Sequence, residues 1–296
     1  MKLGVAGQLP KLSNATPAFF PADWRLIDAT ACARVRGHGF AGAQWFVNKP
    51  LEAGRADCEQ VSAAFAGAGL EICQLNGWYE PICSYDDAIR AEGVRGAIAL
   101  VRIGARSKAV SVYIRPGGHN PRGHWFADPE NFSQRTFDLI AQGMRTICHV
   151  AREEGVLVTM EGHVLSALDT PRRMRDLFDA VDSPALKFNM DPTNFTGTVR
   201  DVHDTARILT ELDDLLGAVT IVAHAKDLAI ADRLVLVIEE VVPGTGNMNY
   251  PLFMRLFEKR APDGYFVVEH LPDEDLLKAR DHVVSMAEKL GIALAR

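Results

Sequence analysis

Four apolar runs in the second half of the chain each end on a side chain that can bind a metal ion. Successive members of this set are 30, 33 and 45 residues apart, and they are Glu161, Asp191, His224 and Glu269. Each spacing corresponds to roughly one strand and one helix. One such residue alone is most often a helix cap or a hydrogen-bonded core residue. Four in succession predict a common site.

Three carboxylates and one imidazole would form an oxygen-rich site with a formal charge of −3. A divalent cation offsets the repulsion that would otherwise force the carboxylates to take up protons. Oxygen-rich sites favour Mn²⁺, Mg²⁺ or Co²⁺, whereas structural zinc usually involves thiolates. We therefore predict one divalent ion, Mn²⁺ or Mg²⁺ before Co²⁺ or Zn²⁺.

The elements that would position these residues follow one repeated pattern, in which a short apolar run precedes a longer segment with helical spacing. Asn131–Glu154 and Asp275–Leu290 are two clear helical segments. We predict eight strands, at Leu3–Ala6, Phe40–Val47, Leu70–Leu75, Ala109–Arg115, Val156–Glu161, Ala185–Met190, Val219–His224 and Tyr265–Glu269.

Eight strand–helix units predict an α/β fold, a (β/α)8 TIM barrel that forms a single domain over residues 1–296. A three-layer sandwich ranks second, because no glycine-rich phosphate turn follows the first strand. The strand ends of a barrel meet at one mouth, which would bring the four residues together. Two irregular loops, Pro116–Pro129 and Leu228–Tyr250, follow strand ends at that mouth. The PGTG turn at 243–246 is expected to shape the second loop.

Polar residues near the same strand ends are candidates for substrate contacts. His163, two residues after the strand-five glutamate, can contact substrate oxygens or act as a catalytic base. Lys226 can neutralise an oxyanion or simply pair with Asp227. Asn194 follows strand six and faces the same mouth.

The segment after the fourth strand adds a basic rim that suits a carboxylate or a phosphate, with a solvated loop as the alternative. The rim residues are Arg115, His119 and His124. Three tryptophans near the ends of strands two to four can line a sugar pocket or fill an apolar rim, and they are Trp45, Trp78 and Trp125.

Composition excludes several classes of protein. The chain has 296 residues, 48% of them hydrophobic and 24% charged, which excludes disorder. A net charge of −6 argues against a nucleic-acid partner. The apolar runs are too short for a membrane span, and no signal peptide is expected. Five cysteines without a Cys-x-x-Cys pair predict reduced thiols and a cytoplasmic location.

The segments MEGH, NMDPTN, HAKD and VVEH, together with PGTG, resemble the xylose isomerase-like TIM barrel superfamily, commonly called sugar phosphate isomerases/epimerases. The resemblance covers nearly the whole chain. It implies that Glu161, Asp191, His224 and Glu269 bind the metal, and that the two glutamates act as an acid/base pair. The implied reaction is isomerisation or epimerisation of a small keto-sugar, by proton abstraction next to a carbonyl through a metal-stabilised enediolate.

Two departures from the family pattern keep a second reaction open. Many of the family's epimerases have a histidine where this chain has Asn194, and an arginine shortly after the strand-seven histidine, where this chain has Lys226. The pattern is more similar to branches that act on inososes, keto-acids or oxidised glycosides. The alternative is therefore a lyase: a dehydratase, a decarboxylase or a carbon-glycoside deglycosidase acting on a 3-oxo-sugar or inosose.

Two further classes fit the sequence less well. A DNA-repair endonuclease of this fold class needs additional clustered histidines and a basic groove, which nine scattered histidines and an acidic chain do not suggest. A non-catalytic barrel would be expected to lack one of the four metal-binding residues. Barrels of this family often pair, so a homo-oligomer or a second subunit is compatible with the sequence.

Overall fold

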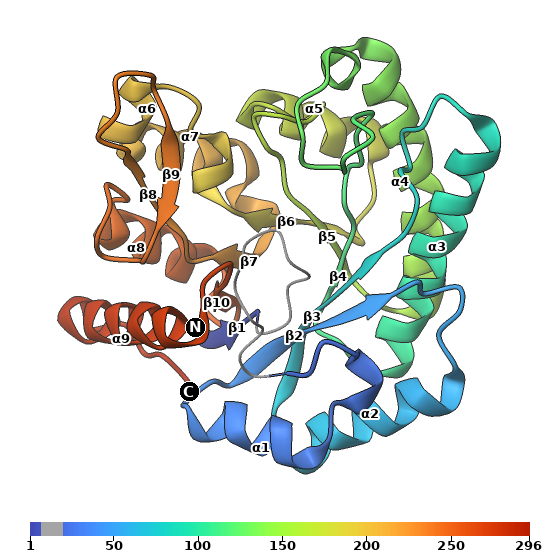
Figure 1. Cartoon of the computed structure of the whole chain (residues 1–296), viewed down its shortest axis with the longest axis horizontal. Helices are drawn as coiled ribbons and strands as arrows, with labels where there is room; N and C mark the ends of the chain where they lie inside the picture. The colour runs from blue at the N-terminus through green and yellow to red at the C-terminus, as the bar shows by residue number, and fades with distance from the viewer. Residues whose placement is uncertain (7–19) are drawn as a thin grey trace.

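Eight parallel strands close into a barrel surrounded by helices in this computed structural model, which describes residues 1–6 and 20–296 (Figure 1). The barrel order is β1-β10-β7-β6-β5-β4-β3-β2. Its strands are β1 (Lys2–Val5), β2 (Gly42–Asn48), β3 (Glu71–Trp78), β4 (Val112–Tyr113), β5 (Val158–Met160), β6 (Leu186–Met190), β7 (Thr220–His224) and β10 (Tyr265–Val268). The predicted TIM barrel is confirmed, and each predicted strand end lies within three residues of the observed one.

Helices form the outer layer and connect successive strands (Figure 1). They are α1 (Ala29–Gly37), α2 (Arg55–Gly67), α3 (Asp87–Arg106), α4 (Gln134–Glu154), α5 (Pro171–Val181), α6 (Val199–His203), α7 (Thr205–Leu216), α8 (Tyr250–Arg260) and α9 (Asp273–Leu290). Short 3₁₀ turns occupy Trp24–Leu26, Pro129–Phe132, Pro192–Phe195 and Gly217–Val219. One of these turns delays the start of α4, where the Ser133 hydroxyl accepts the Thr136 N–H as a cap.

The strands are largely apolar because both of their faces are buried, as the last strand illustrates. Tyr265 and Val267 of β10 belong to a cluster inside the barrel. Phe266, between them, points outward and packs on Phe253 and Phe257 of α8, with ring centroids 4.8 and 5.6 Å away. Alternate residues therefore separate an inner cluster from the main core between barrel and helices.

An antiparallel hairpin, β8 (Asp227–Ile230) and β9 (Ile238–Val241), lies in the segment predicted to be irregular, so that prediction is corrected. The Asp227 carboxylate anchors it by accepting four backbone N–H groups at 2.8–2.9 Å, from Leu228, Gly244, Gly246 and Met248. The PGTG turn is thus tied to the end of β7, as a loop-shaping element.

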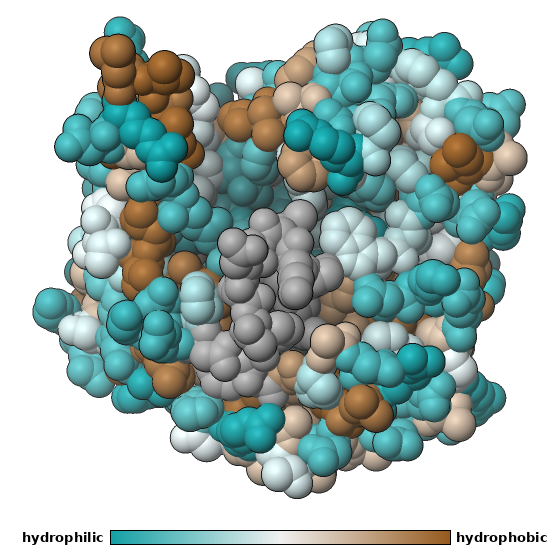
Figure 2. Space-filling model, viewed as in Figure 1, coloured by the Kyte–Doolittle hydropathy of each residue, from teal (hydrophilic) through white to brown (hydrophobic). Residues whose placement is uncertain are grey.

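The face in Figure 2 has an apolar surface over this hairpin, at the upper left, where Leu234, Val235 and Leu236 are exposed. The same face is hollowed near its centre, where hydrophilic residues line the recess (Figure 2).

Two predictions from composition can be compared with the described residues. No helix among them combines the length and the apolar character needed to cross a membrane. All five cysteines are buried and free. Two further expectations, that no phosphate turn follows the first strand and that there is no signal peptide, concern a segment that includes residues 7–19. These residues lie outside the described residues, so both expectations stay predictions.

Candidate active site

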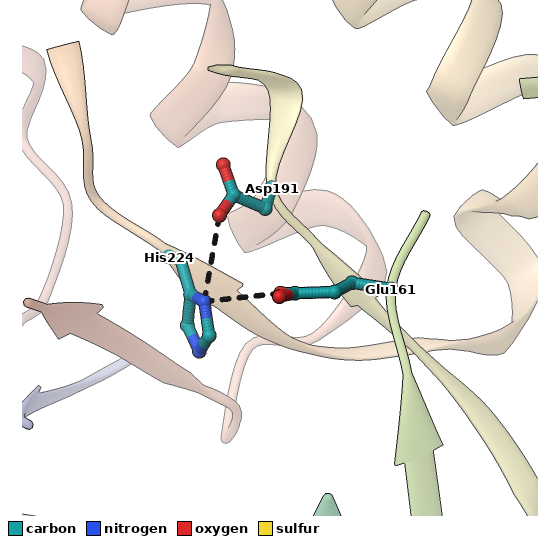
Figure 3. A group of neighbouring side chains, drawn as sticks. All are labelled: Glu161, Asp191 and His224. Atoms are coloured by element: carbon teal, nitrogen blue, oxygen red, sulfur yellow. Dashed lines mark ion pairs between the residues drawn. The ribbon is translucent and has the colours of Figure 1, made fainter. Parts of the chain in front are cut away.

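The four predicted metal-binding side chains meet at the carboxyl ends of β5, β6, β7 and β10, which are neighbours in the barrel. Figure 3 shows Glu161 and Asp191 pointing toward one ring nitrogen of His224. That nitrogen, Nδ1, lies 3.2 Å from Glu161 Oε2, 3.6 Å from Asp191 Oδ2 and 2.9 Å from Glu269 Oε1. All four side chains are buried. The strand ends therefore bring Glu161, Asp191 and His224 into one group, with Glu269 beside His224.

Two neutral donors hold the Glu161 carboxylate in place. Tyr113 donates its hydroxyl to Oε1 at 2.8 Å, and Asn189 donates its amide to Oε2 at 2.7 Å. Burial, together with the nearby Glu161, raises the pKa of Tyr113 well above its usual value, so the phenol keeps its proton. Neither residue was predicted from the sequence. The polar Asn189, two residues before Asp191 at the end of the strand, was the available signal.

Lys226 is buried among the carboxylates. Its Nζ lies 2.8 Å from Asp191 Oδ2 and 2.9 Å from Glu269 Oε1. The suggested pairing with Asp227 is therefore wrong, because that carboxylate is occupied by backbone N–H groups. Burial opposes the charge of Lys226, but Asp191 and Glu269 outweigh burial and raise its pKa well above the usual value. Lys226 is a cation at neutral pH.

The residues present fit a divalent cation. The ligand atoms of Glu161, Asp191 and His224 all lie within 4.8 Å of one another. Asp191 is fully buried; its Oδ2 is ion-paired with Lys226, and its Oδ1 has no hydrogen-bond partner among the described residues. With Glu269 included, three carboxylates and the Lys226 ammonium leave a formal charge of −2, which one divalent ion neutralises. An oxygen-rich set of this kind suits Mn²⁺ or Mg²⁺.

A row of buried polar side chains inside the barrel ends at His224. Gln74 Nε2 donates to Thr159 Oγ1 at 2.9 Å, and Gln44 Nε2 donates to Gln74 Oε1 at 2.8 Å while lying 3.2 Å from His224 Nε2. When His224 presents Nδ1 to a cation, its proton is on Nε2. If the side-chain amides of Gln44 and Gln74 are both rotated by half a turn, the Gln44 oxygen accepts a hydrogen bond from this Nε2–H. The row can hold the tautomer that metal binding needs.

Glu269 is surrounded by groups that favour its charge. Burial opposes ionisation, but His224, His270 and Lys226 outweigh burial and hold the pKa of Glu269 well below its usual range. His270, which has a left-handed backbone with φ of 62°, places Nε2 3.5 Å from Glu269 Oε1 and Nδ1 3.2 Å from Glu240 Oε2. The hairpin thus supplies Glu240 to the site. Neither His270 nor Glu240 was predicted.

A cavity of about 260 Å³ opens above these residues. Its walls include most of the side chains predicted to contact substrate, among them Arg115, Asn194 and Lys226. The full lining is Phe46, Asn76, Trp78, Tyr113, Arg115, Trp125, Glu161, His163, Asn194, His224, Lys226, Glu240, Glu269 and His270. Acidic, basic and aromatic groups face one small space, as in a site for a polar ligand.

His163 lines the cavity with one nitrogen already engaged. The Leu165 backbone N–H donates to His163 Nδ1 at 3.0 Å. In the neutral ring the proton is then on Nε2, which can donate a hydrogen bond. Burial, followed by the nearby Lys226, lowers the pKa of His163 to about 4. The arrangement favours a donor to substrate oxygens over the catalytic base that the sequence left open.

Three of the predicted contact residues lie outside the cavity lining. Trp45 is fully buried and packs on Trp24 and Phe65, because strand alternation turns its neighbours Gln44 and Phe46 inward. The prediction that Trp45 lines a sugar pocket is corrected accordingly.

The other two predicted contact residues outside the lining are the rim histidines, His119 and His124. His119 Nε2 is 2.8 Å from Thr136 Oγ1 and its ring packs on Tyr85, so this residue holds the loop against α4. The His124 ring packs edge-on against Trp78, at 6.1 Å. The expected basic rim therefore reduces to Arg115 alone among these three.

A model of the xylose isomerase-like TIM barrel family matches residues 32–286, so the chain belongs to this family. Over 228 residues it is 22% identical to inosose dehydratase of Histophilus somni strain 129Pt, a match that covers 73% of this chain and 74% of that protein.

Solved structures show the same fold. A D-tagatose 3-epimerase-like protein superimposes with a TM-score of 0.73 at 15% identity, over 98% of each chain. A xylose isomerase-like TIM barrel protein from Mycobacterium smegmatis, in complex with magnesium, gives a TM-score of 0.72 at 17% identity, over 98% of this chain and 96% of that one.

Proposed function

We propose that the protein is a divalent-metal-dependent isomerase or epimerase that moves a proton next to the carbonyl of a small keto-sugar. The observation that carries this proposal is the convergence of Glu161, Asp191, His224 and Glu269 on one buried point below the cavity. The same four residues would hold the ion, Mn²⁺ or Mg²⁺, and the magnesium complex of the M. smegmatis protein supports that choice.

The ion, when bound, would polarise the substrate carbonyl and lower the pKa of the adjacent C–H. Glu161 and Glu269 follow β5 and β10, which are separated in the barrel by β6 and β7. They therefore reach the cavity from two sides. One carboxylate can take the proton from carbon and the other can return a proton to the opposite face. Which of them removes it depends on the configuration of the substrate.

Neighbouring side chains hold each carboxylate for this role. Tyr113 and Asn189 fix both oxygens of Glu161 by donating hydrogen bonds. Lys226 lies against Glu269 Oε1 and keeps that carboxylate ionised. His163, with its proton on Nε2, is placed to donate to a sugar oxygen.

A lyase is the second candidate, and the position of Lys226 favours it. Its ammonium lines the cavity beside Glu269, where it can stabilise negative charge on the oxygen of a leaving hydroxyl, while the glutamate that has removed the C–H proton passes that proton to the same oxygen and water leaves. The distant relationship to an inosose dehydratase agrees with this reaction. A small keto-sugar remains the proposed substrate in both cases.

We also propose a cytoplasmic location, and the five buried, free cysteines agree with it.

Deuterium exchange tests the proposal directly. The protein loaded with Mn²⁺ is incubated in deuterated water with ketoses, inososes and 3-oxo-glycosides, before and after chelation. We expect deuterium at a carbon next to the carbonyl, lost on chelation and reduced about 10²- to 10⁴-fold in Glu161→Gln and Glu269→Gln. Product mass separates isomerase from lyase.

Glu153→Gln, an exposed change on α4, is the matched control and should exchange at the wild-type rate. Exchange that is insensitive to both chelation and Glu161→Gln would contradict the proposal.

A further inference from the structure

Arg115 is a buried cation whose guanidinium lies over aromatic rings. It follows β4, is 2% exposed, and lines the cavity together with Glu161 and Glu269. Its guanidinium carbon lies 3.9 Å from the ring centroid of Trp78 and 5.0 Å from that of Tyr79. Its backbone N–H donates to the Tyr79 hydroxyl at 2.9 Å. The side chain is therefore oriented before any ligand arrives.

No group of the described residues satisfies this guanidinium. Nε, Nη1 and Nη2 are all buried, and none has a hydrogen-bond partner of acceptable geometry within the described part of the chain. The nearby groups that favour its charge are the phenols of Tyr79 and Tyr113, whose pKa values burial raises, so they stay neutral. A buried charge without a counterion is strongly unfavourable unless a ligand provides one.

Lys226, the other buried cation of the cavity, has counterions within the protein. Lys226 contacts two carboxylates, Asp191 and Glu269, at 2.8 and 2.9 Å. Its charge is already offset within the protein. Of the two buried cations in this lining, Arg115 is the one that lacks a carboxylate among the described residues.

The chemistry of Arg115 selects one class of anion. A guanidinium offers a planar fork of N–H donors that matches the two oxygens of a carboxylate. One positive charge balances the single negative charge of a carboxylate. A phosphate dianion would bring an additional negative charge into a cavity of about 260 Å³ that already holds Glu161 and Glu269.

We infer that Arg115 binds a carboxylate of the substrate, so that the cavity takes a keto-sugar acid in preference to the neutral sugar. The inference rests on the proposed function, since it places the carbonyl end of the same molecule at Glu161 and Glu269. The carboxylate end then lies against the fork of Arg115, which Trp78 and Tyr79 hold in place.

Three ketohexose probes that differ only at the last carbon test this inference: D-fructose, D-fructuronate and D-fructose 6-phosphate. Exchange with deuterated water and equilibrium binding by calorimetry are measured on the Mn²⁺-loaded protein. We expect kcat/KM for exchange and the affinity to be about 10- to 100-fold higher for D-fructuronate than for D-fructose. Arg115→Gln should remove that preference, while Arg115→Lys should restore part of it.

Arg122→Gln is the matched control, because Arg122 lies on the same loop, is exposed and stacks on Phe126. It should not change the preference. A preference for D-fructose, or an Arg115→Gln variant that keeps its thermal unfolding midpoint and loses all three probes equally, would overturn the inference. Preference for D-fructose 6-phosphate would overturn the choice of carboxylate.

The two proposals fail separately. Exchange on D-fructose that depends on Glu161 and not on Arg115, with no gain from the carboxylate, contradicts the inference and supports the proposed function. Arg115-dependent binding of D-fructuronate without exchange on any probe supports the carboxylate site and contradicts the proposed reaction.

Discussion

Lys226 and Arg115 line the same cavity and are both buried, yet the chain surrounds them in opposite ways. Lys226 lies between two carboxylates, so removing it would leave buried negative charge behind. Arg115 lies between aromatic rings with its donors unsatisfied by the described residues. The difference teaches that burial alone does not assign a role to a charge. A buried cation with carboxylate partners balances the charge of the protein's own residues. A buried cation without such partners is a candidate for binding an anionic ligand.

Substitution of Lys226 by methionine should have the largest effect on stability. Lys226→Met leaves Asp191 and Glu269 buried without their cation, and breaking a buried pair in this way costs about 3–5 kcal/mol. Urea unfolding in the presence of a chelator measures the free energy of unfolding. Added Mn²⁺ should narrow the deficit, because the ion supplies the missing positive charge.

Lys278→Met, which removes an exposed partner of Asp275, serves as the control and should leave the free energy of unfolding unchanged within experimental error. Equal losses of unfolding free energy in Lys226→Met and Lys278→Met would show that Lys226 does not balance the buried carboxylates.

Substitution of Asp227 tests whether its carboxylate stabilises the hairpin and the PGTG turn by accepting backbone N–H groups. Asp227→Asn keeps the size of the side chain but replaces one acceptor oxygen by a donor facing backbone N–H groups. We expect a loss of about 2–3 kcal/mol in unfolding free energy, together with faster amide hydrogen exchange at Gly244 and Gly246. Unchanged exchange at these two glycines would show that the carboxylate does not anchor the turn.

Substitution of Arg115 should have the smallest effect on the free energy of unfolding, in contrast to substitution of Lys226. Arg115→Met replaces an unsatisfied buried charge by an apolar side chain of similar length, so the ligand-free protein should unfold within about 1 kcal/mol of wild type or be more stable. Arg260→Met is the matched control, because Arg260 Nε lies 2.6 Å from Asp213, and it should lose about 1–3 kcal/mol. A larger loss in Arg115→Met than in Arg260→Met would assign Arg115 a structural role.

The barrel and the four strand-end residues could be predicted from the sequence because both depend on local patterns. Apolar runs that alternate with helical segments identify the strands, and the geometry of a closed parallel barrel then brings their carboxyl ends together. Asp191 and His224 needed no further information to be placed side by side.

The rest of the site depends on contacts that the linear pattern does not contain. Which face of β2 turns inward decides between Trp45 and Phe46, and an apolar run buried on both faces carries no such signal. The hairpin that delivers Glu240 is anchored by Asp227 through N–H groups up to 21 residues away. The partner of Lys226 was likewise misassigned to its neighbour in sequence, because the true partners come from other strands.

Calorimetric titration of the chelated protein with Mn²⁺ tests the metal centre on which the proposed chemistry depends. We predict one ion per chain, with binding weakened at least about tenfold in Asp191→Asn and unchanged in Asp281→Asn, an exposed control on α9. A wild-type protein that binds no divalent ion, or binds it equally well without the Asp191 carboxylate, would contradict the assignment of Glu161, Asp191, His224 and Glu269 as a metal site.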